Sequence, residues 1–415
     1  MSYTPSKEIL ERYADVLVNF ALGGGKGIKR GEVVRVTTTE SARPLFVALH
    51  HAIVKAGGHM LSDYHLDDDA GIQRTFFEIA KDHQLDFFPA KHMRGLVDDV
   101  DHSIYIVASN DPHALKGVNP KKIMRRGIAV KPYRDWRTEK ELKGKFTWTI
   151  GLYGTEAMAQ EAGLTLDEYW EQIINACFLD EVNPIAKWKD VYRKLEVYRR
   201  KLNALSPQID RLHVVGEDAD LWIKLGDKRA WLGGSGRNIP SFELFTSPDC
   251  RGTEGWIRFN QPLYRYGNKV EGIKLEFKGG KVVKSSATSN EKLLKEMIAT
   301  EGADMVGEFS LTDSRFSRIT KFMAETLFDE NIGGPEGNTH IALGASYKDC
   351  YAGDVSKLTK AQAAKLGYND SSVHTDIIST TKRTVTAHLH DLPRKAGGKA
   401  GGKTKVIYQD GQFVL

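Results

Sequence analysis

The sequence predicts a chain of mixed α/β and α+β class. An N-terminal α/β domain with a mostly parallel sheet is expected over residues 1–205, and a β-rich C-terminal domain over residues 206–415. Three observations support this division. Segments of helical period alternate with β-branched runs in the first half, a long amphipathic helix follows over residues 185–205, and a series of short strands fills the second half.

Elements of the first half follow the rhythm of β-α units around a parallel sheet. Apolar residues at helical spacing indicate the helices, and short runs rich in β-branched side chains indicate the strands. The predicted helices cover residues 6–22, 42–56 and 72–82, and the predicted strands cover residues 33–39, 59–64 and 103–108.

A glycine-rich segment, Gly23–Gly27, lies between the first predicted helix and the first predicted strand. A phosphate-binding loop would follow a strand, open a helix and end in Gly-Lys-Ser/Thr. Here Lys26 is followed by Gly27, and the order of the elements is reversed. The segment is therefore predicted to be a connecting loop.

The second half begins after two helical patterns, at residues 165–177 and 185–205, and the domain boundary is placed near residue 205. A hairpin turn is predicted at Lys278–Lys281, because its two glycines tolerate positive φ. The predicted strands of this half cover residues 211–215, 221–225, 256–260, 273–277 and 282–286.

Composition describes an ordinary globular protein of 415 residues, of which 41% are hydrophobic. No apolar run approaches the roughly 18 residues that span a bilayer, and the first residues lack a signal-peptide core. A cytoplasmic protein without membrane contact is expected. Cys177, Cys250 and Cys350 are odd in number and lack CxxC spacing, which predicts free thiols.

The net charge of +5 comes from 59 Lys and Arg against 54 Asp and Glu, and one tract accounts for the excess. Residues 392–405 contain no acid and no aromatic residue, so they are interpreted as a flexible, solvated loop and not as a nucleic-acid footprint. No nucleic-acid partner is expected. The basic residues of the tract are Arg394, Lys395, Lys399, Lys403 and Lys405.

Candidate hard-metal ligands gather in the C-terminal half. Three carboxylates and two imidazoles are enough to hold two divalent ions with positions left for water and substrate. His374 and Asp376 are two positions apart, so on a strand both point to one face, and His340 opens an apolar run and is expected at a strand mouth. The full set is Glu243, Glu308, His340, His374 and Asp376, with Tyr347 beside them. Most of these residues are far apart in the sequence, so only folding could assemble them. Residues 206–415 are therefore expected to form the domain that binds metal and carries catalysis.

The chain resembles the aminopeptidase T family, the metallo-aminopeptidases related to aminopeptidases S and T, along nearly its whole length. The order and spacing of several sequence words carry the resemblance. These words are Tyr13–Val18, Val215–Leu221, Asn238–Pro248, Gly307–Glu308, Phe328–Asn331, His340–Gly344, Val373–Asp376 and Ile407–Phe413.

The resemblance implies a peptide hydrolase that removes residues from a free N-terminus. It also implies a cytoplasmic homodimer in which the two domains enclose an internal cavity. The metal ligands it implies are Glu243, Glu308, His340, His374 and Asp376, with Tyr347 as an active-site tyrosine. One departure lies beside a ligand, since the residue before Glu243 is usually Gly in the family and is Phe242 here.

The predicted mechanism uses two divalent ions and an activated water. Glu308 is expected to be a bridging ligand or the general base, and Tyr347 to donate a hydrogen bond to the oxyanion. The ligand types suit zinc, cobalt or manganese and, less well, magnesium. Two alternatives stay open: a metal-dependent hydrolase of another amide or ester, and a catalytically inactive metal-binding protein that interacts with a partner.

Overall fold

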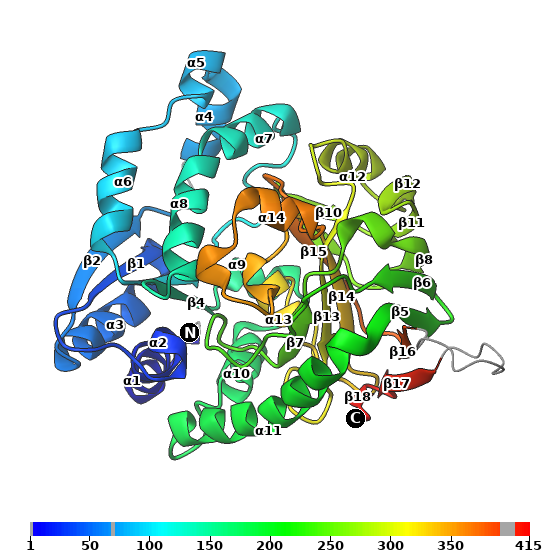
Figure 1. The fold of residues 1–415 in the computed structure, drawn as a ribbon. Helices are drawn as coiled ribbons and strands as arrows, with labels where there is room; N and C mark the ends of the chain where they lie inside the picture. The colour runs from blue at the N-terminus through cyan, green and yellow to red at the C-terminus, as the bar shows by residue number, and fades with distance from the viewer. Residues whose placement is uncertain (1–2, 68–70, 391–402) are drawn as a thin grey trace, which may run out of the picture.

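A four-stranded parallel sheet forms the centre of the N-terminal region (Figure 1). The structure is a computed structural model that describes residues 3–67, 71–390 and 403–415. The predicted α/β class with a parallel sheet is confirmed, because every neighbouring pair of these strands is parallel. In sheet order the strands are β2 (His59–His65), β1 (Val33–Thr39), β3 (His102–Val107) and β4 (Thr147–Leu152).

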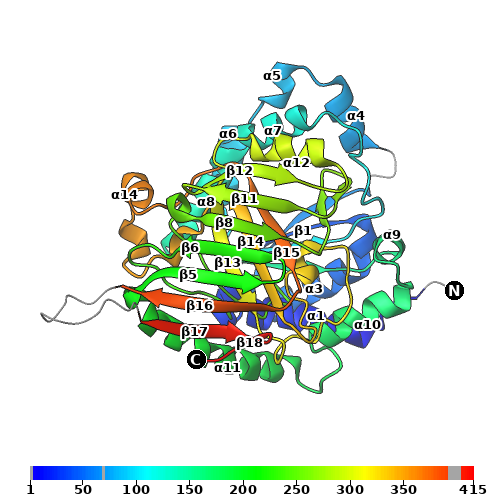
Figure 2. The same cartoon turned by 90° about the vertical axis from the view of Figure 1, so that its right-hand side faces the viewer.

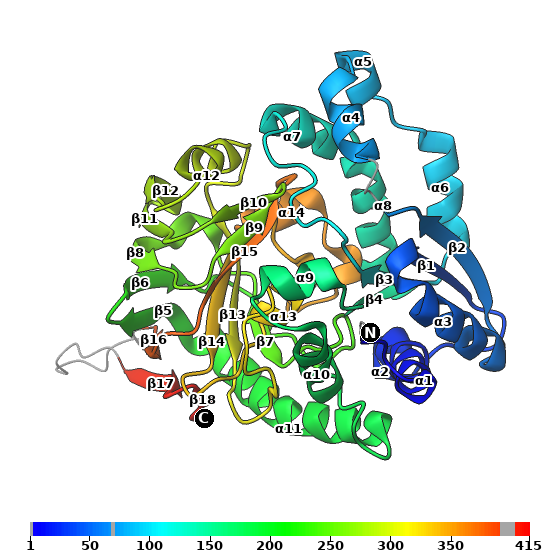
Figure 3. The same ribbon diagram turned by 180° about the vertical axis from the view of Figure 1, so that it is seen from behind.

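Helices surround this sheet, and the first of them packs against α3 (Figure 3). The hydroxyl of Ser6 accepts the amide of Ile9 at 3.3 Å, which caps the start of α1. The helices of this region are α1 (Lys7–Val16), α2 (Leu22–Gly25), α3 (Arg43–Lys55), α4 (Ile72–Ile79), α5 (Asp82–Leu85), α6 (Ala90–Asp99), α7 (Pro120–Ala129), α8 (Lys131–Leu142), α9 (Glu156–Glu161), α10 (Leu166–Ala176) and α11 (Pro184–Leu205).

The glycine-rich segment is a turn between the end of the first helical stretch and β1, as predicted. Gly23 and Gly24 adopt φ of +63° and +64°, which ends the helical path. The amide of Gly27 donates to the carbonyl of Leu22 at 2.9 Å and completes the reversal. Nothing in this arrangement opens a helix toward a phosphate.

Two antiparallel sheets form the C-terminal region, with the eight-stranded sheet in front of the four-stranded one in Figure 2. The predicted β-rich character is confirmed. The larger sheet has the order β12 (Lys281–Ser286), β11 (Lys274–Lys278), β8 (Glu254–Arg258), β6 (Ala219–Lys224), β5 (Ile209–Gly216), β16 (Arg383–Leu389), β17 (Thr404–Gln409) and β18 (Gln412–Phe413).

The smaller sheet carries the candidate ligands. Its order is β15 (His374–Ser379), β14 (Asn338–Gly344), β13 (Val306–Thr312) and β7 (Glu243–Thr246). Besides short 3₁₀ turns, the described residues of this region also form a pair of short strands and three α-helices: β9 (Leu263–Arg265), β10 (Asn268–Val270), α12 (Glu291–Ile298), α13 (Thr326–Asp329) and α14 (Lys360–Lys365).

The segment before β7 connects the two regions. The amide of Ile150 in β4 donates to the carbonyl of Arg237, and the amide of Ile239 donates to the carbonyl of Ile150, both at 2.9 Å. Asn238 therefore forms a parallel bridge with Ile150 at the edge of the N-terminal sheet. Buried side chains of both regions belong to one hydrophobic cluster, so the core is continuous across them.

Three smaller predictions have different outcomes. Cys177, Cys250 and Cys350 are buried free thiols, as predicted. Most of the basic tract, residues 392–402, lies outside the described residues, and Lys403 and Lys405 beyond it are exposed. Among the residues that the structure describes, none of the helices has both the length and the apolar character needed to cross a bilayer.

Candidate metal centre

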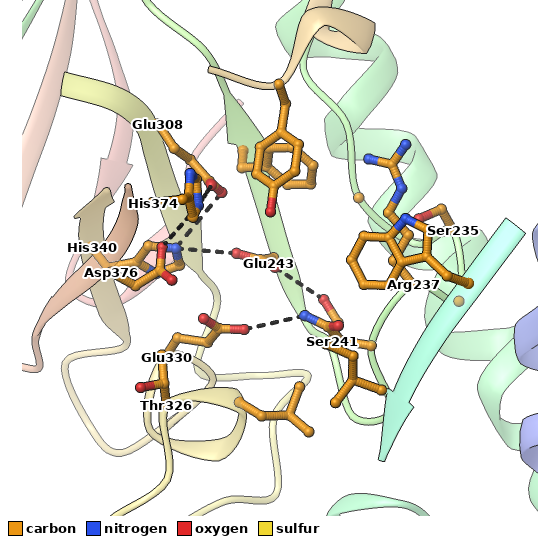
Figure 4. Close-up of a pocket in the computed structure, with 18 of the residues that line it drawn as sticks. Ser235, Arg237, Ser241, Glu243, Glu308, Thr326, Glu330, His340, His374 and Asp376 are labelled. Carbon is orange, nitrogen blue, oxygen red and sulfur yellow. Dashed lines mark hydrogen bonds and ion pairs between the residues drawn. The ribbon is translucent and has the colours of Figure 1, made fainter. Parts of the chain in front are cut away.

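A cavity of about 310 Å³ lies between the parallel sheet of the N-terminal region and the smaller antiparallel sheet of the C-terminal region, which contains β7, β13, β14 and β15 (Figure 4). All six residues predicted from the sequence line it, so folding brings together positions from residue 243 to residue 376. The opposite wall comes from β3, β4 and the loop that leads to β7. The residues on that wall are Tyr105, Val107, Trp148, Ile150 and Gly233–Asn238.

Strand register places the five candidate ligands on one face of the four-stranded sheet. Glu243 pairs with Thr312 in β13, which lies four positions after Glu308 and therefore points to the same side. His340 pairs with Ser310, and Asp376 pairs with Ala342, which continues the same face across β14 and β15. The expected strand-mouth position of His340 is wrong, because β14 begins at Asn338 and pairing extends on both sides of His340.

A bulge in β13 sets the direction of Glu308. The register with β14 shifts between Val306 and Glu308, and Gly307 occupies the irregular position. A Cβ atom there would lie 2.4 Å from the carbonyl oxygens of both Gly344 and Ala345, so only glycine fits. The Gly307–Glu308 pair is thus a structural requirement for presenting this carboxylate to the cavity.

Glu308 lies between the two imidazoles. His374 Nε2 is 3.2 Å from one of its carboxylate oxygens, and His340 Nε2 is 3.8 Å from the other. His340 Nε2 also lies 3.4 Å from Glu243 Oε2, and His374 Nε2 lies 3.4 Å from Asp376 Oδ1. Two ligands of one zinc ion, each about 2.1 Å from it in a tetrahedral site, are separated by about 3.4 Å, which matches these distances.

Hydrogen bonds outside the cluster orient its members. His374 Nδ1 lies 2.8 Å from the carbonyl oxygen of Ala345, so this nitrogen carries a proton and Nε2 is the nitrogen that faces the carboxylates. The hydroxyl of Ser310 donates to Glu243 Oε2 at 2.7 Å. His340 Nδ1 is buried and has no hydrogen-bond partner among the described residues.

The buried carboxylates of the cluster would be stabilised by a nearby positive charge. Burial, reinforced by the charge of Glu308, raises the pKa of Glu243 to about 7 even though His340 opposes the shift. Burial would lower the pKa of His340, but hydrogen bonding to Glu308 and the charge of Glu243 raise it to about 9. Imidazolium groups thus compensate buried carboxylates, which is the task a divalent cation would perform there.

Tyr347 lies beyond the end of β14, where its amide donates to the Ser247 hydroxyl at 2.8 Å. Its ring packs edge-on against His374, with centroids 4.9 Å apart, and against Phe245 at 5.5 Å. Burial and the charge of Glu308 raise its pKa well above the usual value. The phenol therefore stays protonated near neutral pH and can donate a hydrogen bond.

Sequence analysis did not assign two residues of the cavity. Glu330, buried beside the cluster, forms a possible ligand group with His340 and Asp376, and Asn238 Nδ2 donates to it at 3.3 Å. Arg237 lies across the cavity from the cluster (Figure 4). The available signal for Glu330 was its place in the Phe328–Asn331 word, whereas no local pattern marks Arg237.

The chain as a whole matches a known family. The family described as thermophilic metalloprotease (M29) matches residues 6–413. The chain belongs to this family. The predicted family is thereby confirmed, together with the expectation of a metal-dependent aminopeptidase.

Named relatives are similar in sequence to this chain over nearly their full length. Aminopeptidase PepS of Streptococcus thermophilus is 27% identical over 99% of this chain and 98% of its own. Aminopeptidase AmpS of Bacillus subtilis (strain 168) is 28% identical, covering 98% of both. The solved structure of wild-type AmpT from Thermus thermophilus is similar to this M29 enzyme with a TM-score of 0.79 and 25% identity, covering 99% of this chain and all of that chain.

Proposed function

We propose that this M29 enzyme releases N-terminal residues from peptides at a site for two divalent ions. One observation carries the proposal: Glu308 belongs to two possible ligand groups at once. The first group joins it to Glu243 and His340, and the second joins it to His374 and Asp376. A carboxylate shared by two adjacent three-ligand groups is the arrangement that a two-metal hydrolase needs.

The side chains divide the chemistry among them. Divalent ions bound at this site would supply Lewis acidity and would lower the pKa of water toward neutrality. Hydrogen bonding and the charge of the two histidines outweigh burial and lower the pKa of Glu308, so it is ionised for its role as bridging ligand or general base. The phenol of Tyr347 donates a hydrogen bond to the oxyanion, a contact worth about 3 kcal/mol in comparable donors.

The charge of the cavity favours substrates with a free N-terminus. Five carboxyl groups line it against one guanidinium, that of Arg237, which is already paired with acids. With two divalent ions held by the two ligand groups that share Glu308, Glu325 and Glu330 are the carboxyl groups left over, and they can pair with an α-ammonium group, whereas an acetylated terminus carries no charge. Peptides with a free N-terminus are therefore the proposed substrates.

We further propose zinc, cobalt or manganese as the metal, since the ligands combine imidazole nitrogen with carboxylate oxygen, and magnesium as a weaker occupant.

The family resemblance supports a cytoplasmic homodimer whose domains meet near residue 205, without a nucleic-acid partner. Sedimentation of the full chain tests the dimer, and a monomer at working concentration would contradict it.

The activity is tested with protein stripped by a chelator and resupplied with single divalent metals. Matched short peptides with free and acetylated N-termini are the substrates. Metal-dependent release of the first residue from the free-amine peptides alone is expected. Equal cleavage of both sets would indicate another hydrolase, and bound metal without cleavage would indicate a binding protein.

A further inference from the structure

Arg237 joins two acidic side chains that come from distant parts of the chain. Its Nη2 atom lies 2.9 Å from Glu141 Oε1, at the C-terminal end of α8, and also contacts Asp349 Oδ2. All three side chains are about four-fifths removed from solvent, with exposed fractions of 21%, 22% and 18%. The triad therefore spans the N-terminal region, the loop before β7 and the segment after β14.

The N-terminal region holds Arg237 from several directions. The indole Nε1 of Trp148 in β4 donates to Glu141 Oε1 at 2.9 Å, the same oxygen that Arg237 contacts. The guanidinium carbon also lies 5.8 Å from the Trp148 ring. Since the backbone carbonyl of Arg237 accepts from Ile150, both its main chain and its side chain are attached to β4 and α8.

The other end of the triad is next to the active-site tyrosine. Asp349 lies two residues after Tyr347 in a single 3₁₀ turn, which the amide of Cys350 closes by donating to the Tyr347 carbonyl at 3.1 Å. The guanidinium carbon of Arg237 is 6.0 Å from the Tyr347 ring. A bond that fixes Asp349 therefore also fixes the backbone from which the phenol projects.

A role for Arg237 in binding a substrate carboxylate does not fit its surroundings. Two carboxylates already share its single positive charge, so the triad as a whole is negative. A third carboxylate would be repelled by the two that Nη2 already contacts. Because both contacts use the same Nη2 atom, the guanidinium charge is held between Glu141 and Asp349.

We propose that Arg237 is a positioning residue that holds the Tyr347 phenol in its productive place, with Asp349 as the link to Tyr347 and with Glu141 and Trp148 as the anchor in the N-terminal region. The inference rests on the proposed role of Tyr347. It gives the N-terminal region a part in the reaction rate beyond covering the cavity. The positioning contacts are made by Arg237, Asp349, Glu141 and Trp148. None of these four residues is among the five candidate ligands, so metal binding is separate from this role.

A double-mutant cycle tests the proposal. Tyr347→Phe is expected to lower kcat roughly 100-fold, as loss of an oxyanion donor does elsewhere. Arg237→Lys keeps the charge but ends one bond short of the Nη2 position, and is expected to lower kcat roughly tenfold or more with KM nearly unchanged, because small misplacements of a catalytic group are costly. In the Tyr347→Phe background, Arg237→Lys is expected to have no further effect on kcat.

Controls separate positioning from damage to the fold. Asp349→Asn removes the negative charge from the same link and leaves only a neutral acceptor, so it should reproduce the effect of Arg237→Lys. Both variants should bind as much zinc as the wild type, measured by metal analysis. Arg125→Lys is the matched control, since Arg125 also bridges two carboxylates, Asp82 and Asp86, on an exposed helical surface, and it should leave kcat unchanged.

Each outcome is decisive. If Tyr347→Phe lowers kcat while Arg237→Lys and Asp349→Asn do not, the positioning role is overturned and the role of Tyr347 stands. If Arg237→Lys lowers kcat by the same factor in the wild-type protein and in Tyr347→Phe, Arg237 acts independently of Tyr347. That result also overturns the positioning role. Unchanged kcat in Tyr347→Phe would reject the proposed role of Tyr347 and this inference with it.

Discussion

The ring of Phe242 stacks on that of Trp188 in α11, with centroids 5.2 Å apart and planes 20° apart. Phe178 meets Phe242 edge-on at 6.0 Å, and the Phe242 side chain is fully buried. Phe242 precedes Glu243 at the position where the resemblance to the family leads us to expect Gly, yet it is not among the residues that line the cavity. The departure therefore changes the packing behind the ligand strand and leaves the cavity wall to its neighbours.

Phe242→Ala is expected to lower the free energy of unfolding by about 3–5 kcal/mol, because it leaves a cavity between two rings in the core. Urea unfolding of the metal-free protein measures this. Phe87→Ala is the matched control, since the Phe87 side chain is 64% exposed and should change stability little. A loss below about 1 kcal/mol would mean that Trp188 and Phe178 repack without the ring.

Glu308→Gln is expected to abolish measurable turnover, because an amide can serve neither as a charged bridging ligand nor as a general base. Release of the first residue from a free-amine peptide is the measurement. Glu32→Gln is the control, since Glu32 also contacts an imidazole, that of His102 at 2.9 Å, and neither residue lines the cavity. Wild-type rates in Glu308→Gln would remove Glu308 from the mechanism.

Removal of metal by a chelator is expected to lower the melting temperature. Glu243, Glu308, Glu330 and Asp376 are then left close together without a divalent cation. At a free metal concentration about 1,000 times Kd, binding contributes about 4 kcal/mol of stability. Calorimetry with and without added zinc, cobalt or manganese measures the shift, and identical melting curves would argue against a bound ion.

His113→Gln is expected to destabilise the protein more in mild acid than in base. The carbonyl of Gly267 and the carboxylate of Glu161 raise the pKa of His113, with His113 nitrogens 2.9 and 2.7 Å from their oxygens. A raised pKa contributes stability that is complete below the unfolded value, about 6.5, and is lost as pH rises through the folded value.

The measurement is the difference in melting temperature between His113→Gln and wild type at about pH 5.5 and at about pH 9. Glu161 stays ionised at both, because its pKa is lowered below its usual range. The difference should shrink at the higher pH. A constant difference would show that His113 acts through packing alone.

Several elements could be predicted because their signal is local. The strand predicted over residues 33–39 is β1 with the same bounds, since a run of β-branched residues favours the extended backbone whatever surrounds it. Helices α7 and α8 were not predicted. Neither has a buried residue, and lysine and arginine side chains are frequent in both, so neither shows the buried apolar face by which the other helices were predicted.

For the candidate site, the sequence determined the residue types and one piece of geometry. The spacing of His374 and Asp376 placed both on one strand face, because side chains alternate along a strand. The resemblance supplied the remaining ligands. The sequence alone also determined the two fold classes, since helical and strand periods are written into consecutive residues.

Only the tertiary structure decided how these side chains meet. It placed His340 inside β14, set the direction of Glu308 by a bulge at Gly307, and brought Glu330 and Arg237 to the same cavity. The physical reason is that strand pairing and the contact between the two regions join segments far apart in the sequence, such as Glu243 with Thr312 and Ile150 with Asn238. Such pairing depends on hydrogen bonds and packing between distant residues, which no local period encodes.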